Sequence, residues 1–205
     1  MDINVLKEVA RELMINRKAH IGREKGFIYY HGERVGKLSL KLREHILGDN
    51  SSHDDIMVIA SLFHDVAKGI EPHGRYGAVL VKDILKEHCT ESEIEKISEI
   101  IHYHTLRKQD NNYSEYIKIV QDADVLDHFG SIEIWMNFQY SAYEDKPMYK
   151  SLEFYKNEFE SHAKKCRDSL NYQVSRKIFD DKIKFVHSFI DRFKVETQGD
   201  FYIEI

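Results

Sequence analysis

The chain has 205 residues, of which 42% are apolar, and this is enough material for one well-buried core. Its 30 Lys and Arg residues are outnumbered by 35 Asp and Glu residues, and the net charge of -5 argues against nonspecific electrostatic binding to DNA or RNA backbones. The two cysteines, in no C-x-x-C spacing, give no support to a disulfide framework or a thiolate zinc site.

The start of the chain lacks the pattern of an export signal. Met1-Asp2-Ile3-Asn4 is not a basic region followed by an apolar run, and no later stretch approaches the apolar length that a bilayer requires. We therefore expect a reduced, cytoplasmic protein with no membrane attachment.

Sparse proline and glycine predict an all-α fold. Two prolines and ten glycines leave long segments uninterrupted, and apolar residues recur at helical spacing along them. We predict helices at residues 2–18, 29–47, 53–67, 74–88, 92–106, 114–128, 130–143, 150–170 and 173–194. We expect one domain over residues 1–205: a helical bundle with its core at about 25–130 and additional C-terminal helices at about 130–194.

Three sites carry signals for helix ends. Ser52 precedes an acidic first turn, and Thr90-Glu91-Ser92-Glu93 has the spacing of a capping box. Gly48 is placed to close the helix before it.

Ionisable residues lie on the apolar faces of the predicted helices. His31 shares a face with Val35 and Leu42, at offsets of four and eleven, and so points toward the core. The adjacent pair His64-Asp65 ends an apolar segment, where a buried carboxylate is costly unless a cation or several donors compensate it.

The same pattern continues through the next three helices. His73 lies in line with Gly77 and Leu80. The spacing favours His104 over His102 as the inward-facing histidine of its helix. Asp124 follows Ile117 and Val120 at offsets of seven and four.

Taken one at a time, these residues have a plain structural interpretation, because a single histidine on an apolar face is usually a hydrogen-bonded core residue. The combination is different. Imidazoles and carboxylates that converge from five helices would repel one another or stay unpaired, whereas a divalent cation neutralises the carboxylates and binds neutral imidazole nitrogens. The sequence therefore predicts a metal site.

The order of these residues resembles the HD superfamily of metal-dependent phosphohydrolases, which takes its name from an adjacent His-Asp pair. The resemblance is carried by His31-Gly32-Glu33-Arg34-Val35, Leu62-Phe63-His64-Asp65-Val66-Ala67-Lys68 and Val120-Gln121-Asp122-Ala123-Asp124. It implies that the metal ligands are His31, His64, Asp65 and Asp124. Asp122 is the rival for the last position, and both the helical spacing and the motif favour Asp124.

Two branches of the superfamily compete for the details. The surroundings of His73 and His104 resemble branches that hold two metals, such as diadenosine-tetraphosphate hydrolases and cyclic-dinucleotide phosphodiesterases, so these residues are candidates for a second metal site or for substrate contacts. Residues 25–194 as a whole resemble the small stand-alone bacterial HD hydrolases, which commonly bind one metal. We weight the longer resemblance more and expect one firmly bound ion and a weaker second one.

The expected chemistry follows from the ligand types. Mixed nitrogen and oxygen ligands favour manganese or iron, with magnesium, cobalt, nickel or zinc as possible occupants. Such an ion lowers the pKa of bound water and polarises a phosphoryl oxygen. The candidate catalytic residues are Asp65, Lys68 and Arg34. Lys68 and Arg34 are expected to contact phosphate oxygens and stabilise the negative charge of the transition state. Arg107 is a further residue that could reach a phosphate, although it could equally be a solvated helix end.

The predicted function is hydrolysis of a small-molecule nucleotide or phosphate ester by metal-activated water. Within the stand-alone branch, the specific expectation is conversion of a nucleoside triphosphate to a monophosphate and pyrophosphate. The alternatives are a diadenosine-tetraphosphate or cyclic-dinucleotide hydrolase and a non-catalytic nucleotide-binding module.

Overall fold

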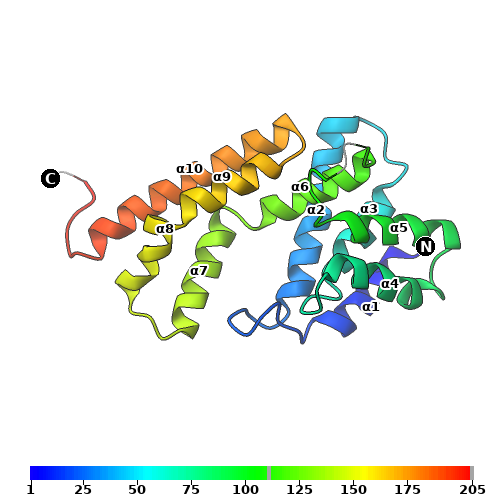
Figure 1. Cartoon of the computed structure of the whole chain (residues 1–205), viewed down its shortest axis with the longest axis horizontal. Helices are drawn as coiled ribbons and strands as arrows, with labels where there is room; N and C mark the ends of the chain where they lie inside the picture. The colour runs from blue at the N-terminus through cyan, green and yellow to red at the C-terminus, as the bar shows by residue number, and fades with distance from the viewer. Residues whose placement is uncertain (110–111, 204–205) are drawn as a thin grey trace. The chain divides into compact units, whose positions relative to one another are not determined.

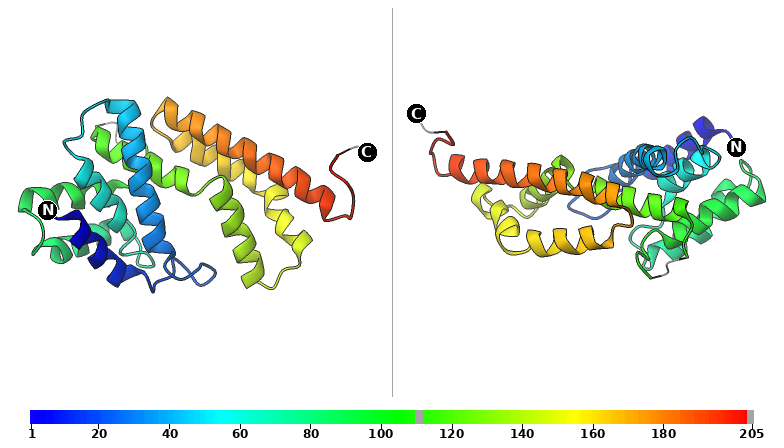
Figure 2. Two further views of the ribbon diagram at one scale, coloured as in Figure 1. Left: turned by 180° about the vertical axis from the view of Figure 1, so that it is seen from behind. Right: turned by 90° about the horizontal axis from the view of Figure 1, so that it is seen from above.

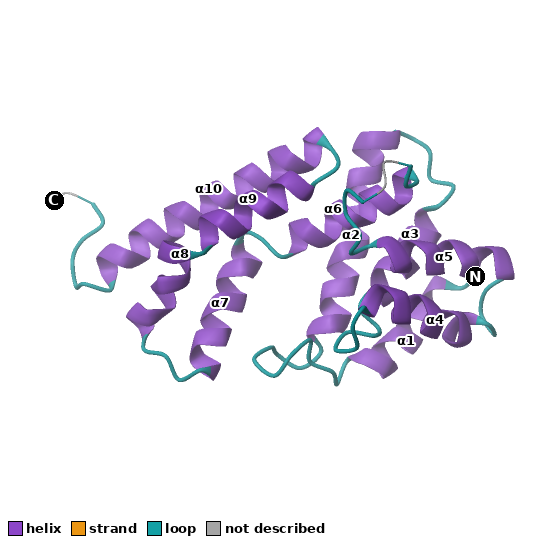
Figure 3. Cartoon of the chain, in the orientation of Figure 1, coloured by secondary structure: helices purple, strands orange, loops and turns teal. Residues whose placement is uncertain are grey.

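Helices are the only regular elements in the described part of this computed structural model, residues 1–109 and 112–203 (Figures 1 and 3). The prediction of an all-α fold is confirmed. Within the same residues, no helix combines the length and the apolar character needed to cross a membrane. The chain divides into two compact units, Met1–Asp127 and His128–Ile205.

The first unit is built around α3, whose buried residues run almost without interruption from Ile56 to Phe63. Its helices are α1 (Ile3–Met14), α2 (Phe27–Leu47), α3 (Asp54–Phe63), α4 (His73–Leu85), α5 (Glu91–Tyr103) and α6 (Glu115–Asp127). Helix α2 packs along α3 and α6, α4 pairs with α5, and α3 also packs on α1, α5 and α6 (Figure 2). His64 and His104, which directly follow α3 and α5, have their ring centroids 4.9 Å apart.

The second unit contains the C-terminal helices. They are α7 (Ser131–Tyr143), the 3-10 helix η1 (Met148–Leu152), α8 (Glu153–Asn157), α9 (Phe159–Ser169) and α10 (Gln173–Glu196). The prediction of one helix over 150–170 is wrong, because the chain leaves helical geometry at Glu158, where φ is -125°. Tyr155 and Phe159 are both buried across this break, so the apolar spacing continues although the helix does not.

Helix α3 ends four residues earlier than predicted and α5 ends three residues earlier, and a histidine causes each early end. His64 Nδ1 donates to the carbonyl oxygen of Ser61 at 2.6 Å, and His104 Nδ1 donates to that of Ile101 at 2.6 Å. In a continuing helix, each carbonyl would instead accept from the backbone amide four residues later. The side chain replaces that bond, and tighter turns follow in both places.

Most of the other predicted helix ends agree with the structure. Thr90 and Glu93 form a capping box at the start of α5, and Gly48 ends α2 with φ of 60°. The predicted cap at Ser52 is wrong by one residue, because His53 is the residue that precedes α3.

Helix α2 approaches α3 closely at Gly32, next to His31. A Cβ atom at Gly32 would lie 2.7 Å from the carbonyl oxygen of Leu62, a backbone atom that cannot move without shifting α3. Gly36, one turn further along α2, has its nearest neighbour at 3.6 Å from the same hypothetical atom. The missing side chain at Gly32 thus sets the spacing between the helices that carry His31 and His64.

We predict that Gly32→Ala lowers the free energy of unfolding by about 2 kcal/mol, because the added methyl group forces the two backbones apart. Gly36→Ala is the matched control. It should leave stability unchanged or raise it by up to about 1 kcal/mol, because alanine favours the helix and finds room there. Urea unfolding of both variants tests this, and an equal effect of the two substitutions would contradict the packing argument.

Candidate metal centre

Four buried histidines converge in the first unit, and each is fixed through Nδ1. His64 and His104 donate this proton to backbone carbonyls, as described above. His31 Nδ1 lies 2.7 Å from a carboxylate oxygen of Asp127. Because carbonyl and ionised carboxylate oxygens only accept, Nδ1 carries the proton, and Nε2 is left to face the interior of the site.

His73 follows the same rule. Its Nδ1 lies 2.9 Å from a carboxylate oxygen of Glu71, two residues before it, and its Nε2 lies 3.2 Å from Nε2 of His104. His31 and His64 form an equivalent pair, with their Nε2 atoms also 3.2 Å apart. The centre therefore holds two facing pairs of imidazole nitrogens.

We call His31 and His64, together with the carboxylates of Asp65 and Asp124, the first cluster. Asp124 Oδ1 lies 3.1 Å from His31 Nε2 and 3.7 Å from His64 Nε2. Asp65 Oδ1 lies 3.9 Å from the same nitrogen of His64. His31, His64 and Asp65 offer ligand atoms that all lie within 4.8 Å of one another. The four residues predicted as metal ligands are thus brought together from α2, α6 and the end of α3.

A second cluster shares one carboxylate with the first. Asp65 Oδ1 lies 3.3 Å from His73 Nε2 and 3.8 Å from His104 Nε2, and these three residues also lie within ligand distance of one another. His73 stands at the start of α4 and His104 directly follows α5. Asp65 therefore lies between two groups of potential cation ligands.

The pKa values of these groups show how strongly they interact. Burial lowers the pKa of His31, but its hydrogen bonds to Asp124 and Asp127 outweigh burial and raise the pKa to about 9. Burial also lowers the pKa of His104, and there burial prevails. Burial alone would raise the pKa of Asp65, but the charge of His64 and hydrogen bonds from His104 and His73 hold it well below its usual value.

The donor set fits a divalent cation. Each pair of Nε2 atoms needs a proton or a metal between its lone pairs, since neither nitrogen has its ring proton on that side. His31, His64 and Asp65 form one group of ligand atoms, and Asp124 lies beside both of its imidazoles. His73 and His104 form the next group with the same Asp65, and all are nitrogen and oxygen ligands of the kind that manganese, iron and zinc accept.

Every carboxylate of the centre also has a permanent cation. The pairs are Lys68 Nζ with Asp65 at 3.4 Å, Arg34 Nε with Asp127 at 2.9 Å, and Arg107 Nη2 with Asp124. Arg34 holds Asp127 through two nitrogens, which makes it the most rigid of the three. Arg34, predicted as a partner of substrate phosphate, is placed by the structure as the partner of Asp127.

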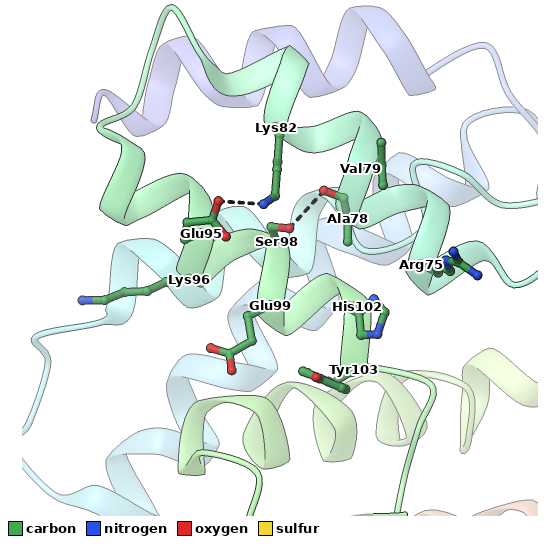
Figure 4. A pocket seen from close by; sticks show the side chains of 10 residues that line it. All are labelled: Arg75, Ala78, Val79, Lys82, Glu95, Lys96, Ser98, Glu99, His102 and Tyr103. Carbon is green, nitrogen blue, oxygen red and sulfur yellow. Dashed lines mark hydrogen bonds and ion pairs between the residues drawn. The ribbon is translucent and has the colours of Figure 1, made fainter.

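The structure distinguishes His104 from His102 and Asp124 from Asp122, the two pairs of residues that compete for ligand positions in the sequence. His104 is buried in the centre, whereas His102 is half-buried and lines a pocket of about 570 Å³ between α4 and α5 (Figure 4). Asp124 lies within reach of the imidazoles, whereas Asp122 belongs to none of the clusters of ligand atoms found among the described residues.

From the sequence, Asp127 is one of two acids that could orient a ligand imidazole, carry a proton or cap a helix, and in the structure it contacts His31. Asp127 holds both His31 and Arg34, and its spacing of three residues from Asp124, nearly one helical turn, is the signal that could have ranked it higher. Glu71 was not singled out, and its exposed side chain, one residue before Pro72, carries no signal that distinguishes it from a surface acid.

Comparison with known proteins agrees with this geometry. Residues 28–128 match the HD domain family. An HD-superfamily hydrolase from Bacillus thuringiensis shares the fold, with a TM-score of 0.70 and 27% identity over 97% of each chain. YpgQ from Bacillus subtilis, solved in complex with ADP, has a TM-score of 0.66 and 18% identity over 94% of this chain and 96% of its own.

A protein from Lactobacillus plantarum is similar over 97% of both chains, with a TM-score of 0.65 and 21% identity. No protein of curated function matches the sequence.

We predict that the two clusters bind cations with unequal strength, because the first offers two carboxylates and the second only the shared one. Titration of metal-free protein with Mn²⁺ should show one tight and one weaker site. His73→Ala should abolish the weaker site alone, and His102→Ala is the control that should keep both. Two equally tight sites, or loss of the tight site in His73→Ala, would contradict the assignment; calorimetry and metal analysis give the counts.

Proposed function

Because residues 28–128 of this chain belong to the HD domain family, we propose that the protein is a metal-dependent phosphohydrolase that acts on a nucleotide. The observation that carries the proposal is the convergence of His31, His64, Asp65 and Asp124, with Lys68 beside Asp65. A cation held by these four residues would acidify a coordinated water and polarise a phosphoryl oxygen.

The protein residues have separable roles in this proposal. Asp65 and Asp124 supply the negative charge that retains the cation, and the Nδ1 hydrogen bonds of His31 and His64 fix the imidazoles that complete the set. Lys68 is only half-buried, so its ammonium group can reach both Asp65 and a phosphate oxygen beside it. Arg34 stabilises Asp127 and, through it, the orientation of His31.

We infer that the reaction converts a nucleoside triphosphate to a monophosphate and pyrophosphate. Water adds to the α-phosphorus, the bond to the bridging oxygen of the β-phosphate breaks, and pyrophosphate leaves with that oxygen. The resemblance of residues 25–194 to the small stand-alone HD hydrolases supports this choice, and the ADP bound to YpgQ supports a nucleotide ligand. We expect manganese or iron as the physiological cation.

The second cluster favours another candidate. Asp65, His73 and His104 would hold a second cation next to the first, and pairs of metal ions sharing a ligand suit phosphate-ester and phosphoanhydride cleavage in larger substrates. A diadenosine tetraphosphate or a cyclic dinucleotide would then be the substrate.

We predict that His64→Ala and Asp65→Ala each lose the tightly bound cation and lower turnover by at least about 100-fold, because each removes a direct ligand. Mn²⁺ should stabilise the unaltered protein against heat and have little effect on either variant. Metal content and activity are measured on the same samples. Full metal occupancy in either variant would rule out the ligand assignment.

The products identify the bond that breaks. With Mn²⁺, we predict that ATP or dATP yields the monophosphate and pyrophosphate as first products, without free orthophosphate. Diadenosine tetraphosphate cleaved to two diphosphates, or a cyclic dinucleotide opened to a linear one, would instead select the second candidate. Chromatography of all four reactions distinguishes them, and no turnover of any substrate would favour a non-catalytic nucleotide-binding protein.

A further inference from the structure

The cations of the centre have an electrostatic consequence. Asp65, Asp124 and Asp127 each already have a positively charged partner without any metal. A divalent cation therefore adds positive charge to a site whose carboxylates are balanced. The partner of a ligating carboxylate must then share that carboxylate with the metal, and two cations on one carboxylate repel each other.

Arg107 is the residue on which this repulsion acts most directly. It lies three residues after His104, and its Nη2 contacts Oδ2 of Asp124, while Oδ1 of the same carboxylate faces His31 and His64. Its second contact is weak, from Nε to the carbonyl oxygen of Gln121 at 3.4 Å. The side chain is 22% exposed, so solvent and a bound molecule can reach it.

Arg34 provides the contrast. It also pairs with a buried carboxylate, but the oxygens of Asp127 accept from Arg34 and from His31 Nδ1, and Asp127 belongs to none of the ligand clusters found among the described residues. A cation in either cluster thus leaves the Arg34–Asp127 pair in place.

We propose that Arg107 exchanges partners when a divalent cation binds: it neutralises Asp124 in the cation-free protein and binds a phosphate oxygen of the substrate in the loaded protein. The second half of this inference rests on the proposed phosphohydrolase function. A guanidinium group suits both partners, because its planar fork matches carboxylate and phosphate oxygens alike. Arg107 is thus a substrate-binding residue beyond those of the HD motif.

The first test measures stability in both states of the centre. In the presence of a chelator, Arg107→Gln should lower Tm by roughly 3 to 6 °C, because the buried Asp124 loses the permanent positive charge of the guanidinium group. With saturating Mn²⁺ the difference from the unaltered protein should disappear, since the metal then balances Asp124. An equal loss of stability in both states would show that Arg107 stays on Asp124 and would overturn the inference, as would no loss with the chelator.

The second test measures binding of inorganic phosphate by calorimetry to Mn²⁺-loaded protein freed of excess metal. Arg107→Gln should keep the Mn²⁺ stoichiometry of the unaltered protein and weaken phosphate binding roughly 10- to 100-fold. Arg107→Lys should recover part of the loss.

The control is Arg75→Gln, which removes an exposed arginine that lines the pocket between α4 and α5 (Figure 4). It should leave phosphate binding unchanged. Unaltered phosphate affinity in Arg107→Gln, or loss of Mn²⁺ from it, would overturn the inference. Neither result depends on turnover, so the proposed function can fail by showing no hydrolysis while Arg107 still passes both tests.

Discussion

The arrangement of the candidate metal centre depends on the hydrogen bonds that the Nδ1–H groups of four histidines donate. His31, His64, His73 and His104 each donate that proton to an oxygen outside the ligand clusters, so that Nε2 of every ring points inward. Two of these hydrogen bonds also end helices, because the side chain takes a carbonyl that the helix would have used. The same interaction therefore fixes the backbone at the ends of α3 and α5 and orients the imidazoles that converge there.

The charges of the centre extend this order to its carboxylates. Burial of three carboxylates in one helical unit would be costly without compensation, and Lys68, Arg34 and Arg107 supply it from three different segments. A bound cation would add positive charge to this balanced set and would favour an anionic ligand.

Helical spacing was sufficient to place the inward-facing groups, but it could not reveal their partners. It selected His104 over His102 and Asp124 over Asp122, and the structure brings the selected residues to the clusters. It could not show that Arg34 binds Asp127, because 93 residues separate them and any surface acid would satisfy the pattern equally. It also joined α8 and α9, because the irregular residue Glu158 leaves the spacing of buried residues intact.

The four Nδ1 acceptors differ in what a mutation can do to them. His64 and His104 are anchored by peptide carbonyls, which every amino acid at positions 61 and 101 would provide. His31 and His73 are anchored by the side chains of Asp127 and Glu71, which a single codon change can remove. Divergence among descendants of this chain can therefore adjust two of the imidazoles by altering their acceptors, while the other two can change only by replacement of the histidine itself.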